Sequence, residues 1–101
     1  MVKYIGMTKK QLYIIAYDIS NDRRRQHVVK LLERLGVRIN WSVFECMLTF
    51  SQVKNLKESL FAIIHHKEDT VVVYPICREC YAKTVYLPED RKIVSKSVIV
   101  V

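Results

Sequence analysis

Hydrophobic periodicity changes back and forth along this chain, and that alternation constrains the fold more than any other feature. Residues 12–17 (LYIIAY) form an apolar run rich in aromatic and β-branched side chains, which is typical of a buried central strand. Apolar residues then recur at helical spacing on one face, as Val28, Leu31, Leu32 and Leu35. We expect a helix over about residues 22–35, ended by Gly36.

The second half of the chain repeats the alternation. Residues 37–50 have a period of two and β character, which predicts two short strands or one strongly bent strand. Ser51 is a good N-cap for a second amphipathic helix. The apolar face of that helix would consist of Val53, Leu56, Leu60, Ile63 and Ile64. Residues 70–76 predict a buried strand in which Pro75 marks an end or an edge. Residues 83–87 are a weaker strand candidate, and residues 97–101 (SVIVV) a strong one.

The resulting order, β-α-β-β-α-β with extra strands behind, predicts an α+β fold of the ferredoxin-like type, with two helices on one face of an antiparallel sheet. A length of 101 residues predicts a single domain over 1–101, with residues 1–11 as an N-terminal extension. Residues 91–101 need a pairing partner, because a bare apolar edge strand promotes aggregation. The sheet of a second copy would supply one.

Charge and composition narrow the function. The chain carries 17 Lys and Arg against 10 Asp and Glu, a net charge of +7, which favours polyanionic partners such as nucleic acid. No apolar run approaches the roughly 20 residues of a membrane helix, and the N-terminus lacks the apolar core of a secretory signal. Three cysteines make a poor disulfide framework. We therefore expect a cytoplasmic protein without a membrane partner.

Asp18 lies where the first apolar strand ends and the helix-entry loop begins. A carboxylate at a strand end is held rigidly yet reaches solvent, so it could bind a metal or act as a base. The alternative is a turn residue that caps the helix entry. Because Ser20, Asn21 and Asp22 can already cap, Asp18 is not needed for that purpose.

Three arginines, Arg23, Arg24 and Arg25, occupy the expected first turn of the helix. Cations are unfavourable at this positive end of the helix dipole, so stability alone would place Asp or Glu there. Phosphate binding is one use for such an arrangement, since helix N-terminal amides and guanidinium groups both suit phosphate oxygens. A solvated basic face is the alternative.

Two segments together resemble a known family. One is residues 17–22 (YDISND), followed by Arg24 and Arg25; the other is residues 36–45 (GVRINWSVFE), followed by Leu48-Thr49. In order and spacing they resemble the small CRISPR-associated endoribonuclease family, the smaller of the two core CRISPR adaptation proteins. The resemblance extends over about residues 12–90.

The resemblance implies a ferredoxin-like homodimer in which each C-terminal β segment adds to the partner's sheet. It also implies spacer acquisition together with the larger adaptation integrase, and binding of double-stranded DNA. Members are described as Mg-dependent endonucleases that act on RNA or double-stranded DNA, while others act as scaffolds. A non-catalytic duplex-DNA-binding scaffold is therefore the alternative function, and an RNA-cleaving, toxin-like protein on the same fold is a third.

The resemblance also assigns residues. Asp18 corresponds to the metal-binding and catalytic aspartate, and Tyr17 and Ser20, which flank it, are the other catalytic candidates. The nucleic-acid-binding positions are Arg24, Arg25, Arg38, Ser42 and Phe44.

The chain also departs from the family pattern. Asn40, Trp41 and Cys46 differ from it, and His27 stands where some members have a second helix arginine. Trp41 could stack on a base, but its place in an alternating strand predicts burial.

A single Asp carboxylate per chain supplies few of the six oxygen ligands that Mg²⁺ takes, although several of these are usually waters. Two Asp18 residues facing each other across a dimer axis would supply two carboxylates, and Mn²⁺ could replace Mg²⁺. The cation would offset negative charge in the transition state of phosphodiester cleavage. Glu45 and Asp22 are the candidates for a general base.

A Cys-x-x-Cys sequence, Cys77 to Cys80, follows the fourth predicted strand. One such pair is half of a zinc site. Cys46, His65 and His66 could complete it, although nothing in their spacing favours this. Free thiols and a local disulfide are the alternatives, and a structural role is favoured over Zn²⁺ binding.

Overall fold

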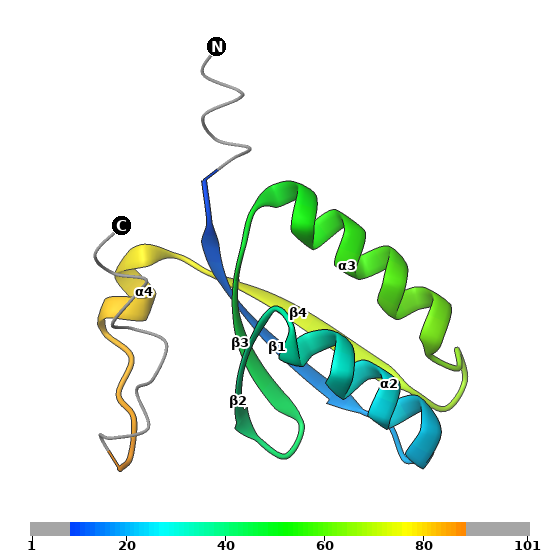
Figure 1. Ribbon diagram of the computed structural model, residues 1–101. Coiled ribbons are helices and arrows are strands. Elements are labelled where there is room, and N and C mark those ends of the chain that lie inside the picture. The colour runs from blue at the N-terminus through cyan, green and yellow to red at the C-terminus, as the bar shows by residue number, and fades with distance from the viewer. Residues whose placement is uncertain (1–8, 89–101) are drawn as a thin grey trace.

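A computed structural model describes residues 9–88 of the chain. The element order, shown in Figure 1, is β1 (Gln11–Asp18), α2 (Asp22–Glu33), β2 (Gly36–Asn40), β3 (Val43–Leu48), α3 (Phe50–Ile63), β4 (Thr70–Ile76) and α4 (Arg78–Ala82). The four strands form one antiparallel sheet in the order β2-β3-β1-β4. The predicted β-α-β-β-α-β order is confirmed, with α4 added.

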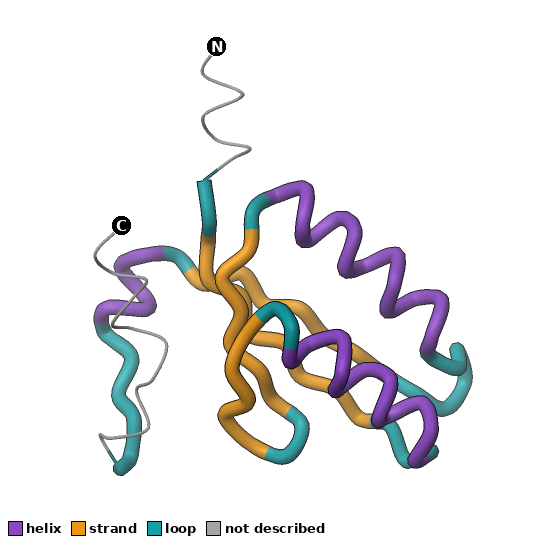
Figure 2. The backbone as a smooth tube through the Cα atoms, viewed as in Figure 1, coloured by secondary structure: helices purple, strands orange, loops and turns teal. Residues whose placement is uncertain are grey.

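Helices α2 and α3 cover one face of the sheet, and α4 lies on the other side (Figure 2). Strand β1 is central, as its apolar sequence predicts. Its residues Ile15 and Tyr17 face the two long helices and belong to the main core. The buried members of this core are Ile15, Tyr17, Ile19, Val28, Leu32, Phe44, Cys46, Leu48, Leu56 and Leu60.

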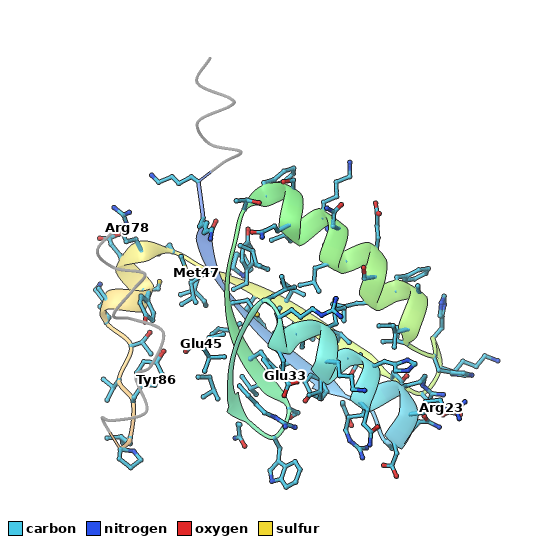
Figure 3. The ribbon with its side chains drawn as sticks, viewed as in Figure 1. Arg23, Glu33, Glu45, Met47, Arg78 and Tyr86 are labelled. Atoms are coloured by element: carbon cyan, nitrogen blue, oxygen red, sulfur yellow. The ribbon has the colours of Figure 1, made fainter. Side chains whose placement is uncertain are left out.

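The opposite face of the sheet, hereafter the second face, carries a smaller apolar cluster. Leu12 of β1 and Tyr81 of α4 are buried there, and Met47 and Tyr86 pack beside them. Figure 3 shows Glu45 and Met47 directed from the sheet toward the α4 side, where Tyr86 lies. This face is only partly covered within residues 9–88, since Val72 and Tyr74 of β4 are 42% and 51% exposed.

The helix boundaries follow from capping. The side chain of Asn21 accepts a hydrogen bond of 3.0 Å from the Arg24 amide and begins α2. Helix α3 begins two residues earlier than Ser51 predicts. Thr49 is its N-cap, and Gln52 completes a capping box with it. The prediction of Ser51 was wrong because the Thr-x-x-Gln pattern satisfies two orphan amides, whereas Ser51 alone satisfies fewer.

Helix α2 ends at Glu33, two residues before the predicted Leu35, and Gly36 is not its cap. Gly36 instead opens β2, and no glycine among residues 9–88 has a positive φ. A Cβ atom at position 36 would collide with the carbonyl oxygen of Glu45 and with Cys46. Close packing of β2 on β3, rather than a turn, therefore requires the glycine.

The segment 37–50 resolves into two strands, β2 and β3, joined by a turn at residues 41–42. An irregularity between Arg38 and Asn40 shifts the register and brings Trp41 into the turn. Trp41 is 81% exposed, so the predicted burial was wrong. The reason is that the period of two does not continue through the bulge.

The predictions for the strands after α3 have different outcomes. Strand β4 is an edge strand, which explains how it accommodates Pro75. Residues 83–87 are not a strand; they run irregularly past the second face. Two predicted segments at the C-terminus, the strand 97–101 and the pairing segment 91–101, lie outside the described residues. The same is true of residues 1–8 of the predicted N-terminal extension. Within residues 9–88, no helix has the length and apolar character needed to span a bilayer.

Candidate nucleic-acid interface and carboxylate site

The sheet topology brings the predicted site residues to one end of the sheet. Strand β1 ends there at Asp18, β4 begins there at Thr70, and the two residues are paired in register. The 41–42 turn and the start of α2 lie at the same end, since Ala16 is paired with Val43. Segments far apart in sequence thus form a common edge around Asp18.

The Asp18 side chain is exposed and extends from the second face. Side chains alternate along a strand, so Asp18 shares its face with Ile14 and Ala16, and Tyr17 points to the helix face. The carboxylate has no hydrogen bond or ion pair among residues 9–88. The carboxylate is therefore accessible to solvent, and its role as a metal ligand stays a prediction.

Tyr17 lies on the opposite side of the sheet from Asp18. It is 5% exposed, and its ring lies 6.4 Å from that of Phe44. Its hydroxyl donates a hydrogen bond of 2.9 Å to the Trp41 carbonyl oxygen, and its amide donates one of 3.0 Å to Ser42. Tyr17 consequently positions the turn next to Asp18, and its hydroxyl is already engaged.

Arg38 of β2 and Trp41 of the turn that follows form an exposed pair. Arg38 Nη2 donates a hydrogen bond of 2.8 Å to the Trp41 carbonyl oxygen, and its Cζ lies 5.8 Å from the Trp41 ring centroid. The same Cζ lies 5.9 Å from the ring of Phe44. Phe44 itself is 0% exposed, so it supports Arg38 from beneath and does not itself reach a ligand.

Arg24 has an intramolecular partner that the sequence did not reveal. Its Nε donates a hydrogen bond of 2.7 Å to Asp69, and its Nη2 donates one of 3.1 Å to Glu68. The guanidinium of Arg24 lowers the pKa of the Asp69 carboxyl, and the amide of His65 contributes a further hydrogen bond of 2.8 Å. Arg24 therefore ties the start of α2 to the loop before β4.

Arg25 is similarly occupied. Its Nη1 donates to the carbonyl oxygens of Ile19 and Ser20, at 3.1 and 3.2 Å, and its Nη2 pairs with Asp22. These contacts close the loop between β1 and α2. Ser20 is exposed, and its backbone is held by this arginine.

The free basic side chains of α2 form a stripe on its outer surface. Arg23, His27, Lys30 and Arg34 are all exposed and are spaced by four, three and four residues. Residues at these intervals lie on one helix face. We call this set the basic stripe. It begins at Arg23 in the first turn of α2, which Figure 3 labels, and its other members follow along the helix sequence.

The two candidate bases are poorly placed for Asp18. Glu45 is 4% exposed and is paired with Ile14, four residues or roughly 13 Å along β1 from Asp18. Its Oε2 accepts a hydrogen bond from the Tyr86 hydroxyl. Asp22 is held by Arg25. Within residues 9–88 the structure also holds no cluster of three or more His, Cys, Asp or Glu side chains suited to a metal.

The sequence did not predict two features of this end of the sheet. The Arg24–Asp69 contact joins residues 45 positions apart, and no local pattern marks Asp69 as the partner. The exposure of Trp41 depends on the bulge in β2. Its neighbouring Asn40, a frequent turn residue, was the available signal.

Most of the chain is similar to a known protein family. The profile of the family described as "CRISPR associated protein Cas2" matches residues 11–84. CRISPR-associated endoribonuclease Cas2 3 of Synechocystis sp. is 46% identical over 65 residues, covering 64% of this chain and 71% of the relative.

Solved structures agree with this match. Streptococcus pyogenes Cas2 has a TM-score of 0.66 at 28% identity, over 72% of this chain and 94% of that one. A chain from a partial Cas6-RT-Cas1–Cas2 complex shares the fold, with a TM-score of 0.70 at 23% identity, over 82% of this chain and 91% of that chain. The family match over most of its length shows that this protein belongs to the CRISPR-associated Cas2 family.

Proposed function

We propose that the protein is a metal-dependent endonuclease of CRISPR adaptation, which acts on RNA or double-stranded DNA as a homodimer and works with the larger adaptation integrase. One observation carries the proposal. The exposed, unpaired carboxylate of Asp18 lies at the end of the sheet that also presents Arg38, Trp41 and the start of the basic stripe. On this proposal the cations would bind phosphates at the same end of the sheet as a carboxylate that would hold the metal.

The donor chemistry at this end fits Mg²⁺ or Mn²⁺. Mg²⁺ is usually held by one or two carboxylates, with waters and substrate phosphates filling the other positions. Asp18 supplies one hard carboxylate, and a second Asp18 from the partner copy would supply another. When bound, the cation would offset the negative charge that develops during phosphodiester cleavage. Within this chain, Tyr17 holds the adjoining turn in place and Arg25 closes the loop that follows Asp18.

The surface of β4 supports dimerisation. Its outer edge has no paired strand among residues 9–88. A shallow hollow of about 230 Å³ adjoins it, lined mostly by apolar residues: Lys57, Leu60, Phe61, Ile64, Val71 and Val73. We expect residues 97–101 of the partner to pair with this edge and to place apolar side chains over the hollow.

The basic stripe supports nucleic-acid binding. Its members carry no ion pair within residues 9–88, whereas Arg24 and Arg25 are held by carboxylates. Free cations on one helix face can contact successive phosphates. We therefore assign Arg23 and Arg38 to direct phosphate contact, and Arg24 and Arg25 to holding the site together.

The non-catalytic scaffold is the second candidate. It is favoured by the sparse acid content of the site, because neither Glu45 nor Asp22 is free to act as a base near Asp18. In that case the basic stripe would hold duplex DNA for the integrase, and Asp18 would not take part in cleavage.

Cleavage of labelled RNA and duplex DNA distinguishes the candidates. The wild-type protein should cleave with Mg²⁺ and stop with EDTA, and Asp18→Ala should lose cleavage while keeping its affinity for nucleic acid. Glu58→Gln on α3, which changes an exposed carboxylate outside the site, is the control and should keep activity. Cleavage by Asp18→Ala at the wild-type rate would refute the catalytic proposal; an inert wild type that binds duplex DNA would establish the scaffold.

Salt dependence tests the basic stripe. Replacing Lys30 and Arg34 by Gln should weaken binding and reduce the slope of log affinity against log salt, because fewer counterions are released. Lys54→Gln on α3 changes an exposed lysine outside the stripe and should leave the slope unchanged. Equal slopes in all three proteins would show that the stripe does not contact phosphates.

A further inference from the structure

Two exposed cysteines lie together just beyond the edge strand β4. Cys77 follows β4 and is the N-cap of α4, and Cys80 lies three residues later in the first turn of that helix. The Cys80 amide donates a hydrogen bond of 3.3 Å to Cys77 Sγ. The i, i+3 spacing in a helical turn brings both side chains to one side of the helix.

The short helix is anchored, so this geometry is built into the fold. Tyr81 follows Cys80 directly and is 5% exposed, packed in the cluster with Leu12 on the second face. At the other end, Cys77 continues from Ile76, which is paired with Leu12 in the sheet. The two thiols are thus fixed from both sides while remaining accessible to solvent.

The pKa values of the two thiols are shifted in opposite directions. Hydrogen bonds from the Cys80 amide and from the Cys80 thiol lower the pKa of Cys77, although the nearby carboxylate of Glu79 opposes this. Interaction with Cys77 raises the pKa of Cys80. The third cysteine behaves differently: Cys46 is 0% exposed, and burial raises its pKa to about 11. Cys77 therefore combines a lowered thiol pKa with access to solvent, and Cys80 is the accessible second thiol beside it.

Zinc would need ligands beyond these two thiols. Tetrahedral zinc sites in proteins use three or four protein ligands. Cys46 is buried, and no group of three or more metal-binding side chains exists within residues 9–88. Two thiols without further ligands are suited instead to disulfide exchange.

We propose that Cys77 and Cys80 form a redox-active dithiol that exchanges with low-molecular-weight disulfides such as oxidised glutathione. Cys77 thiolate attacks one sulfur of the disulfide, the S–S bond breaks, and one thiolate leaves, so that Cys77 carries a mixed disulfide. Cys80 then loses its proton and attacks Cys77 Sγ, and the second thiolate leaves. The protein dithiol is oxidised to the Cys77–Cys80 disulfide, and the small disulfide is reduced to two thiols.

The site is independent of nucleic-acid cleavage and adds a redox function to a different part of the molecule. Figure 3 shows Arg78, which lies between the two cysteines in sequence, at the α4 end of the structure and away from Arg23 at the start of the basic stripe. Failure of the proposed nuclease activity would leave the thiol chemistry unaffected, and the reverse also holds.

Mass spectrometry of the full-length protein tests the proposal. The reduced protein treated with oxidised glutathione should lose two hydrogens in a Cys77–Cys80 disulfide, while the buried Cys46 stays reduced. Cys80→Ser should stop at one glutathione adduct on Cys77, because the resolving thiol is absent. Cys77→Ser should form adducts much more slowly than Cys80→Ser.

Alkylation at graded pH supplies a second readout. In the folded protein the midpoint for Cys77 should lie below that of Cys80, and the two midpoints should coincide in guanidinium chloride. Equal midpoints in the folded protein, or stable glutathione adducts on both cysteines without the internal disulfide, would overturn the proposal. Stoichiometric zinc in the purified protein, released on alkylation of both cysteines, would overturn it in favour of a metal site.

Discussion

The guanidinium of Arg24 is bound to the buried carboxylate of Asp69, with Nε 2.7 Å from Oδ2. The side chain of Asp69 is 0% exposed and that of Arg24 is 22% exposed. Arg24, at the start of α2, thus connects this helix to the loop that precedes β4. The same contact explains how the positive helix end tolerates this arginine.

Replacing Asp69 by Asn should lower the melting temperature, because the guanidinium loses its charged partner. Since the folded protein lowers the pKa of Asp69, ionisation of this carboxyl stabilises the fold above the pKa of an unfolded Asp, about 3.9. That contribution is lost as the pH falls below this value. Thermal unfolding should therefore separate wild type and variant at pH 7, and the difference between them should shrink progressively as the pH falls below about 3.9. Glu68→Gln changes a 60% exposed partner and is the matched control, with a smaller effect.

Trp41→Ala should weaken binding of single-stranded nucleic acid by about 1–3 kcal/mol, the value of one base stacked on an aromatic side chain. The 81% exposed ring beside Arg38 is the reason for this expectation. Fluorescence anisotropy with labelled oligonucleotides measures the effect. Phe50→Ala removes a 60% exposed aromatic ring at the other end of the sheet and should leave the affinity unchanged. Unchanged affinity in Trp41→Ala would remove this residue from the interface.

Gly36→Ala should destabilise the protein by about 1–3 kcal/mol, the usual effect of overpacking. The added methyl group would meet the backbone of β3 at Glu45, which cannot move without disturbing the sheet. Chemical denaturation measures the change. Ser59→Ala on the exposed surface of α3 should stay within about 0.5 kcal/mol of wild type. A Gly36→Ala protein as stable as wild type would show that β2 and β3 can separate at this point.

Tyr86→Phe should destabilise the protein by about 1–3 kcal/mol at neutral pH, because Glu45 loses its donor. Burial and the Glu45 carboxylate raise the pKa of Tyr86. A group whose pKa is raised on folding stabilises the folded protein at pH values below the pKa that the group has in the unfolded chain, which is about 10 for tyrosine. This stabilisation is lost as the pH rises above that value.

Melting curves between pH 7 and 11 check this sign. Wild type should lose stability above about pH 10, and Tyr86→Phe should lose less over the same range. Tyr74→Phe, at a 51% exposed position, is the control and should follow wild type. A wild-type protein and a Tyr86→Phe protein with parallel curves would contradict the coupling between Tyr86 and Glu45.

Local patterns in the sequence were sufficient for the four strands and the two long helices in their order, but not for α4. The apolar run 12–17 predicts a central strand because only a strand buried on both faces tolerates it. The stripe of Val28 and Leu32 predicts α2, since a helix must bury one face. Asp18 was predicted at the strand end, and the structure places it there, exposed.

Contacts between distant residues were settled only by tertiary structure. The partner of Arg24 lies 45 residues away, so no short-range pattern distinguishes it from the exposed Arg23. The exposure of Trp41 follows from a bulge that interrupts the strand period, and Gly36 is required by the backbone of a neighbouring strand. A sequence states which side chains are charged or apolar along one segment; which of them meet depends on how the sheet brings separate segments together.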